Sequence, residues 1–118
     1  MMEAHAIAKD IRMSPRKVRL VVDQIRGRPV SEATSVLRFS KKAAAGPVEK
    51  TLLSAVANAR EKADRDGDSL DVDDLVVSRV FVDPGPSLKR WRAAAMGRAT
   101  PRRRRTSHIT VVVTAKEN

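Results

Sequence analysis

The residues with the clearest chemical potential are arginines and lysines gathered in one segment near the C-terminus. Between Pro84 and His108 the chain carries eight cationic side chains and no acidic one. They are Lys89, Arg90, Arg92, Arg98, Arg102, Arg103, Arg104 and Arg105. Most are arginines, whose planar guanidinium groups donate in pairs to phosphate oxygens and stack on bases. The segment therefore predicts binding to a polyanion. Trp91 within it either stacks on an unpaired base or packs against the body of the domain.

A second group of cations stands at the start of an expected helix. Ser14 and Pro15 are typical of a helix N-terminus. Arg16 and Lys17 follow in the first turn, where the helix dipole disfavours positive charge by about 0.3–1 kcal/mol each. A bound phosphate would satisfy the free amides and both side chains together, whereas the alternative is an ordinary solvated basic face. Four arginines are expected to share the outward face of this helix: Arg12, Arg16, Arg19 and Arg26.

The acidic side chains make a weaker case for chemistry. Asp71, Asp73 and Asp74 could hold a metal ion for hydrolysis, but they lack the glycine and the terminal glutamate of a calcium loop. Cysteine is absent, His5 and His108 are distant in sequence, and no glycine-rich phosphate loop occurs. We therefore expect no enzyme, no catalytic residue, no metal site and no cofactor. The three aspartates are interpreted as a solvated turn, with a small metal-dependent hydrolase as the alternative.

Length and composition limit the class of protein. The chain has 118 residues with a net charge of +10, and its 42% hydrophobic content is enough for one modest core. A wholly disordered basic tail is excluded on that ground. No apolar run reaches the roughly 20 residues of a membrane span, and no export signal is evident, so we expect a cytoplasmic protein. Residues 9–42 carry ten cations against three acids, whereas residues 61–74 carry seven acids against two cations, which predicts one nucleic-acid side and one solvated side.

A stripe of apolar residues predicts the first helix. Val18, Val21, Val22 and Ile25 recur at helical spacing behind the expected N-terminus. Gly27 is expected to end this helix, because glycine readily adopts the left-handed conformation found at helix C-termini.

Two further helices are expected. The shorter one follows Pro29 and ends near Phe39–Ser40. The third is longer and closes at Asp66–Gly67. A proline beyond the first turn would remove a backbone hydrogen bond, so Gly46–Pro47 requires either a helix start near Gly46 or a kink.

Three short segments rich in small or β-branched residues predict strands, namely Glu3–Lys9, Leu75–Val82 and Ile109–Thr114. Together with the helices they indicate an α+β fold, in which three helices pack on a small three-stranded antiparallel sheet.

The connection Asp83–Ser107 is too long for an ordinary loop and too polar to fold alone. We expect an extended β-hairpin arm, with a turn near Gly97 and an interruption of regular pairing at Pro101. The chain is thus a single domain, 1–118, with a globular body (1–83 and 108–118) and a basic arm (84–107).

Several motifs in order resemble the large-subunit ribosomal protein twenty-two family in its compact bacterial form, over nearly the whole chain. The early motifs are Arg12-Met13-Ser14-Pro15-Arg16-Lys17-Val18-Arg19, Ile25-Arg26-Gly27 and Ser54-Ala55-Val56-Ala57-Asn58-Ala59. The later motifs are Val82-Asp83-Pro84-Gly85-Pro86-Ser87-Leu88-Lys89-Arg90 and Arg105-Thr106-Ser107-His108-Ile109-Thr110-Val111.

The resemblance implies a structural constituent of the large ribosomal subunit, located in the cytoplasm on the ribosome. Its implied partners are 23S-type ribosomal RNA, neighbouring large-subunit proteins and, near the arm tip, the nascent peptide in the exit tunnel; no membrane is implied. An assembly role for the body and the arm is also implied. The RNA contacts carried over by position are Arg12, Ser14, Arg16, Lys17, Arg19, Lys89, Arg90, Arg98, Arg105, Thr106, Ser107 and His108. The reading of the residues themselves adds Arg26, Trp91, Arg92, Arg102, Arg103 and Arg104.

The tip departs from the family. Relatives commonly carry a Pro-Arg-Ala-Lys-Gly-Arg-Ala pattern where this chain has Ala93-Ala94-Ala95-Met96-Gly97-Arg98-Ala99, so two usual cations are missing. The return leg, Thr100 to Arg105, is instead dense in arginine. Our hypothesis is that RNA contact has moved from the tip to this leg.

Two alternatives remain for the basic character. Neutralisation of a phosphate backbone does not distinguish RNA from DNA, so a free-standing nucleic-acid chaperone or DNA-binding protein is the second reading. The run Arg102–Arg105 also has the composition of a nuclear import signal.

Overall fold

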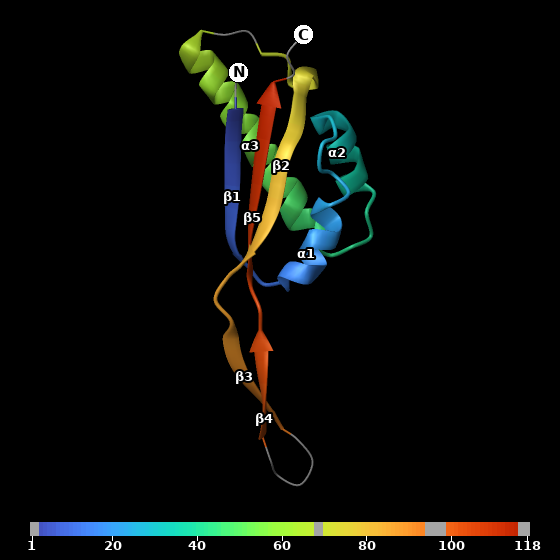
Figure 1. Cartoon of the computed structure of the whole chain (residues 1–118), viewed down its shortest axis with the longest axis vertical. Coiled ribbons are helices and arrows are strands. Elements are labelled where there is room, and N and C mark those ends of the chain that lie inside the picture. The colour runs from blue at the N-terminus through green and yellow to red at the C-terminus, as the bar shows by residue number, and fades with distance from the viewer. Residues whose placement is uncertain (1–2, 68–69, 94–98, 116–118) are drawn as a thin grey trace.

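The computed structural model describes residues 3–67, 70–93 and 99–115, and within these the side chains of 3–67, 70–87 and 105–115. The fold is α+β, as predicted, with three helices, a three-stranded antiparallel sheet and a two-stranded hairpin (Figure 1). The elements are β1 (Glu3–Ile11), α1 (Pro15–Val22), α2 (Val30–Arg38), α3 (Ala45–Asp66), the 3₁₀ turn η1 (Val72–Asp74), β2 (Leu75–Pro84), β3 (Leu88–Ala93), β4 (Ala99–Arg104) and β5 (Ser107–Ala115).

The body sheet has the order β1-β5-β2, so the C-terminal strand is central and both neighbours pair with it antiparallel. Val111 and Val113 of β5 are fully buried. In β2 the pairing register shifts between Val77 and Arg79. This irregularity changes which side of the strand faces inward, and it lets Val80 be buried as well as Val77.

The helices supply the other half of the core. Helix α3 crosses behind the sheet, and α1 and α2 pack along the β2 side (Figure 1). The predicted stripe of α1 and Ile25 are completely buried, as are Leu52 and Ala55 of α3. Alanines of β1, such as Ala4 and Ala6, face this helix layer and are also buried, because small side chains allow close approach of α3.

Helix α1 begins as predicted and ends earlier than predicted. Ser14 caps it with an extended backbone, and Pro15 is its first residue. The helix stops at Val22 rather than at Gly27. Gly27 does adopt a left-handed φ of 79°, but in the turn that follows, where its N–H donates to the Val77 carbonyl at 2.9 Å. Pairing of this turn with β2 replaces continuation of the helix, so the predicted endpoint was wrong.

The other two helices agree with the predictions. Helix α2 follows Pro29 and is capped at Phe39. Helix α3 begins at Ala45, so Pro47 lies within its first turn, where no intrahelical hydrogen bond is lost. Gly67 closes α3 with a left-handed φ of 74°. Among the described residues, no helix is both long enough and apolar enough to cross a membrane.

Strands β3 and β4 form the predicted hairpin and pair only with each other. Leu88 pairs with Arg104 at one end of the hairpin and Ala93 pairs with Ala99 at the other, with no register shift between them. Trp91 lies opposite Pro101. The expected interruption at Pro101 was therefore wrong; a two-stranded ribbon has two open edges, and an edge strand tolerates a residue without an N–H. The expected turn at Gly97 lies outside the described residues.

The arm makes the molecule elongated. The chain measures 66 × 27 × 16 Å, and its radius of gyration is 17.6 Å. A compact domain of this length would have a radius of about 13 Å. The hairpin projects from the end of the sheet where β2 finishes and β5 begins (Figure 1).

Candidate nucleic-acid interface

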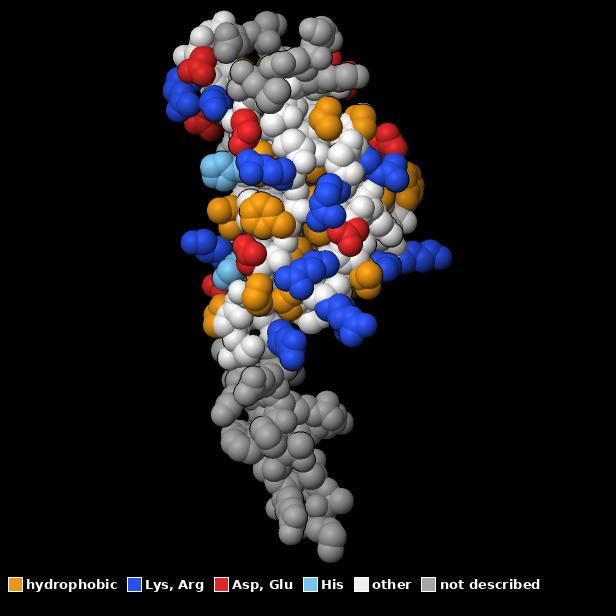
Figure 2. Space-filling model, in the orientation of Figure 1, with side chains coloured by type: hydrophobic (Ala, Val, Ile, Leu, Met, Phe, Trp, Pro, Cys, Tyr) orange, Lys and Arg blue, Asp and Glu red, His pale blue; other side chains and the backbone are white. Residues whose placement is uncertain are grey.

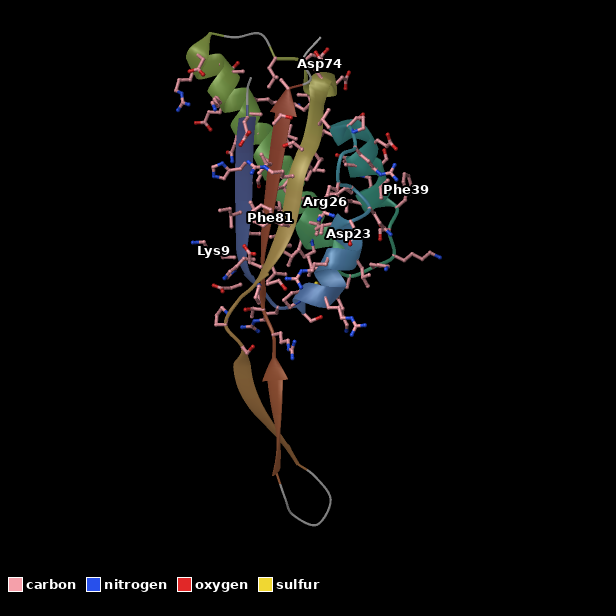
Figure 3. All side chains as sticks on the ribbon, viewed as in Figure 1. Lys9, Asp23, Arg26, Phe39, Asp74 and Phe81 are labelled. Atoms are coloured by element: carbon pink, nitrogen blue, oxygen red, sulfur yellow. The ribbon has the colours of Figure 1, made fainter. Side chains whose placement is uncertain are left out.

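The acidic stretch, residues 61–74, and a group of cations lie toward opposite ends of the body. Asp74, in the acidic stretch, lies at the end of the body opposite the arm (Figure 3). Several lysine and arginine side chains gather where the body meets the arm (Figure 2). The predicted division into a solvated acidic side and a basic side is therefore present in the fold. Asp71, Asp73 and Asp74 are exposed, and in the part of the chain that the structure describes they form no cluster able to hold a metal ion.

A groove of about 860 Å³ opens at this basic end. It is lined by residues of four segments: the loop before α1, α1 itself, the loop between α2 and α3, and the neck, which we define as residues 85–87 and 105–106 joining body to arm. Four of the lining residues are cationic: Arg12, Lys17, Lys42 and Arg105. All four are exposed, the lining contains no acid, and none of them forms an ion pair with a described residue.

The N-terminus of α1 opens onto the same groove. The Lys17 amide donates to the Ser14 hydroxyl at 3.4 Å, and the first turn contains no acidic residue. Arg16 and Lys17 are exposed there, as the sequence predicted. Cations at this position are favourable only beside an anion, because the dipole of the helix is positive at its N-terminus. The local arrangement therefore suits a phosphate group.

Arg19 and Arg26 do not share an outward cationic face with Arg12 and Arg16. The Arg19 guanidinium donates to the Val82 carbonyl at 2.9 Å. Arg26 donates to the Val80 carbonyl at 2.8 Å and to Asp23 at 2.7 Å, and Figure 3 shows it between α1 and β2. The predicted common face was wrong for these two residues, because the open edge of β2 offers carbonyl acceptors within reach of α1.

These contacts, with the turn at Gly27, cover the edge of β2. The opposite edge of the sheet is covered in the same way by α3, because Asn58 donates to the His5 carbonyl at 2.8 Å and Lys62 donates to the Glu3 carbonyl at 2.9 Å. Covered edges prevent pairing with another chain. Several polar residues of the body therefore stabilise the fold rather than face a partner.

The neck is built from hydroxyl contacts that turn inward. The Thr106 hydroxyl donates to the Pro86 carbonyl at 2.6 Å, and the Gly85 amide donates to the Thr106 carbonyl at 2.9 Å. The Ser107 hydroxyl donates to the Met13 carbonyl at 2.6 Å. Thr106 and Ser107 are 5% and 0% exposed, so their side chains position the groove instead of lining its open surface with free donors.

His108 is half-buried and also has an internal contact. Its Nδ1 accepts a hydrogen bond of 3.1 Å from the amide of Asp10. Asp10 has a positive φ of 58° at an irregularity in β1, where the pairing with β5 shifts between Ala8 and Ile11. The histidine thus holds the end of β1 beside the neck.

The arm residues of the predicted interface lie on β3 and β4. Register places Lys89 opposite Arg103 and Arg90 opposite Arg102. Residues directly opposite each other share one face of an antiparallel pair, and like charges there are destabilising. The backbone register also pairs Trp91 with Pro101, Arg92 with Thr100 and Arg104 with Leu88. Arg98 lies outside the described residues.

The sequence reasoning missed five lining residues of the groove, namely Met13, Leu20, Lys42, Ala43 and Ala44. Lys42 was visible as part of a basic segment, but nothing local indicated that the loop after α2 lies beside the N-terminus of α1. Leu20 is outside the valine stripe and is 54% exposed. An apolar residue off the buried stripe of an amphipathic helix was the available signal.

The sequence of the chain matches a known protein family. Residues 6–114 match the family described as Ribosomal protein L22p/L17e. The chain is 54% identical over 116 residues to the large ribosomal subunit protein uL22 of Bifidobacterium longum strain DJO10A, covering 98% of each chain. The same identity and coverage hold for the protein of that name from Bifidobacterium longum subsp. infantis.

The chain therefore belongs to the ribosomal protein L22p/L17e family. The predicted membership of the large-subunit ribosomal protein twenty-two family is confirmed, and with it the expected class, a structural protein of the ribosome located in the cytoplasm. The family gives no support to the hydrolase alternative built on Asp71, Asp73 and Asp74.

Proposed function

We propose that this chain binds large-subunit ribosomal RNA through the groove and the arm, and that it thereby helps the RNA to assemble. The observation that carries the proposal is the groove, in which four cations from separate segments converge beside a helix N-terminus, with no acid in the lining and no ion pair to any described residue. Groups that repel one another are brought together at a cost in free energy, so a polyanionic ligand is the counterpart that the arrangement fits.

The arm supports the same function by a second route. Its like-charged cross-strand neighbours lose their repulsion when phosphates lie between or beside them. We propose that the arm extends along RNA to the wall of the peptide exit tunnel, with the nascent peptide and neighbouring large-subunit proteins as further partners. The names of the Bifidobacterium relatives as large-subunit proteins support a place in the large subunit.

The proposed contacts are revised by the geometry. Arg12, Ser14, Arg16, Lys17, Lys42 and Arg105 form the body contact, and Lys89, Arg90, Trp91, Arg92, Arg98, Arg102, Arg103 and Arg104 form the arm contact. Arg19, Arg26, Thr106, Ser107 and His108 are positioning residues, because their described polar contacts go to the protein itself.

Charge reversal in the groove tests the proposal. A triple variant Arg12→Glu, Lys17→Glu, Arg105→Glu should lose most of its affinity for a large-subunit RNA fragment, and its salt dependence should become shallower. For the unaltered chain, neutralising six to ten phosphates predicts a loss of about 10³–10⁵ in affinity between 50 and 200 mM salt. The matched control reverses three exposed cations of α3 outside the groove lining, Lys50, Arg60 and Arg65, and should bind normally.

Fractionation of cell extracts separates the two binding functions. A ribosomal component sediments with the large particle at moderate salt, whereas a free nucleic-acid chaperone or DNA-binding protein spreads across the gradient. Spreading of the unaltered chain would contradict the proposed function, as would equal affinity of the groove variant and its control for RNA.

A further inference from the structure

The groove has an apolar component that phosphate binding alone does not explain. Besides its four cations and two hydroxyl residues, its lining contains Met13, Leu20, Ala43 and Ala44. Leu20 is 54% exposed on α1, although the same helix buries its valines completely. Exposing a leucine to water is unfavourable by up to about 1.5–3 kcal/mol relative to burial. A ligand that covers it would remove that cost.

The size of the groove narrows the class of ligand. Its volume of about 860 Å³ falls in the range of small-molecule sites, which run from about 300 to 1,000 Å³. A continuous duplex presents phosphates to such a surface but keeps its bases stacked inside the helix. An unpaired nucleotide presents both a phosphate and the flat face of a base, and proteins bind such bases by stacking and apolar contact.

We propose that the groove receives one unpaired nucleotide turned out of the ribosomal RNA, with its base against Leu20 and Met13 and its phosphate between Lys17 and Arg105. This inference rests on the proposed RNA-binding function and adds to it a distinct recognition mode. The body would then recognise a defined unstacked position, while the cations on its rim hold the flanking backbone.

Hydrogen bonds within the protein hold the walls of the groove, which favours such recognition. The Ser107 hydroxyl holds the Met13 carbonyl at 2.6 Å, and Ser14 caps α1 within the same loop. Thr106 is fixed to Pro86 on the other side of the groove. A preformed site avoids the entropy cost of ordering side chains and loops on binding.

Two RNA hairpins of equal length and nearly equal charge test the inference with the full chain. One is fully paired, and the other carries a single bulged 2-aminopurine. We expect the bulged RNA to bind at least ten-fold more tightly, and the 2-aminopurine emission to change on binding because the base moves from solvent onto protein. The fluorescence change requires no variant and reads the base directly.

A leucine pair supplies the matched variants. Leu20→Ser should lower the affinity for the bulged RNA much more than the affinity for the paired RNA, so the ratio of the two affinities should fall close to one. Leu53→Ser is the control, because Leu53 is similarly exposed (46%) on α3 and does not line the groove. Lys17→Gln should lower the affinity for both RNAs by a similar factor, since it removes a phosphate contact.

The outcomes separate the two claims. Equal, salt-sensitive binding of both hairpins with unchanged 2-aminopurine emission overturns the inference and leaves RNA binding intact. A preference for the bulge that survives Leu20→Ser also overturns it, because the base would then lie elsewhere. If neither hairpin binds and a large-subunit RNA fragment also fails to bind, the proposed function itself is overturned, and the inference with it.

Discussion

The hydroxyl of Ser107 donates a 2.6 Å hydrogen bond to the carbonyl of Met13, a residue 94 positions earlier in the chain. Ser107 is the first residue of β5 and is completely buried. Met13 lies in the loop that leads into α1 and lines the groove. This one contact therefore fixes the N-terminus of α1 relative to the end of the return leg of the arm, and both segments carry cations of the proposed interface.

Substituting Ser107 should reduce both stability and RNA affinity. Ser107→Ala leaves the Met13 carbonyl without this donor, and the loss of one part-buried hydrogen bond costs about 0.5–1.5 kcal/mol. Urea denaturation of the full chain measures the stability, and RNA affinity should fall as the groove loosens. Ser78→Ala is the control, because its hydroxyl donates to the Val112 carbonyl at 3.1 Å on an exposed strand position away from the groove. Equal effects of the two variants would contradict a special role for Ser107.

Gly85 is required by a close approach at the neck. A Cβ at this position would lie 2.4 Å from the Thr106 hydroxyl oxygen and 3.1 Å from His108 Cε1. Gly85→Ala should therefore displace Thr106 and cost about 1–3 kcal/mol of unfolding free energy. Gly46→Ala is the comparison, because nothing lies within 4 Å of its Cβ in α3, and it should stabilise the protein by up to about 1 kcal/mol. Thermal melts of both variants should shift in opposite directions.

Arg16 and Arg19 should separate binding from folding. Both are exposed cations of α1, but Arg19 donates to the Val82 carbonyl and Arg16 forms no hydrogen bond with a described side chain or backbone group through its guanidinium. Arg19→Gln is expected to lose about 0.5–1.5 kcal/mol of stability, the value of one partly exposed hydrogen bond. Arg16→Gln is expected to leave the urea midpoint unchanged and to weaken RNA binding. Reversal of the two effects would refute the assignment of Arg19 as a positioning residue.

The elements of this fold were predictable where local chemistry determines them. Ser14 and Pro15 mark the start of α1, and Gly67 closes α3, because caps act within a few residues of chain. Gly27 misled the prediction for a tertiary reason. Its left-handed conformation is present, but its amide pairs with Val77 of β2, fifty residues later, and no pattern around Gly27 contains that partner.

For the candidate interface, the sequence predicted the positive charge but not which residues are exposed or lie close together. The sequence revealed the cations of the first helix turn and of the arm, since excess charge is visible without a structure. The buried positions of Thr106 and Ser107, and the nearness of Lys42 to Lys17, depend on packing between distant segments. Within one motif, Arg105 is exposed whereas Thr106 and Ser107 are buried, and the spacing of these residues did not distinguish them.

Removing the arm should leave a folded body. Replacing residues 88–104 by a two-residue turn deletes both β3 and β4, which pair only with each other, and removes none of the buried core residues of the described body. We expect far-UV circular dichroism to keep its helical signal and urea unfolding to remain cooperative. The truncated chain should still bind RNA weakly through the groove. An insoluble or non-cooperative product would show that the division into body and arm is wrong.

Reversing two charges in the hairpin should stabilise the hairpin in the free protein and weaken its binding to RNA. Lys89 and Arg90 lie opposite Arg103 and Arg102, so the free arm contains two like-charged cross-strand pairs. The double variant Lys89→Glu, Arg90→Glu converts them to opposite-charge pairs, each worth roughly 0.2–1 kcal/mol. In the free protein, the amides of β3 and β4 should therefore exchange with solvent more slowly than in the unaltered chain. RNA affinity should fall at the same time, because two phosphate-binding cations have become acidic. Slower exchange with unchanged RNA affinity would mean that these two residues face away from RNA, and unchanged exchange would mean that charge repulsion does not limit the order of the free arm.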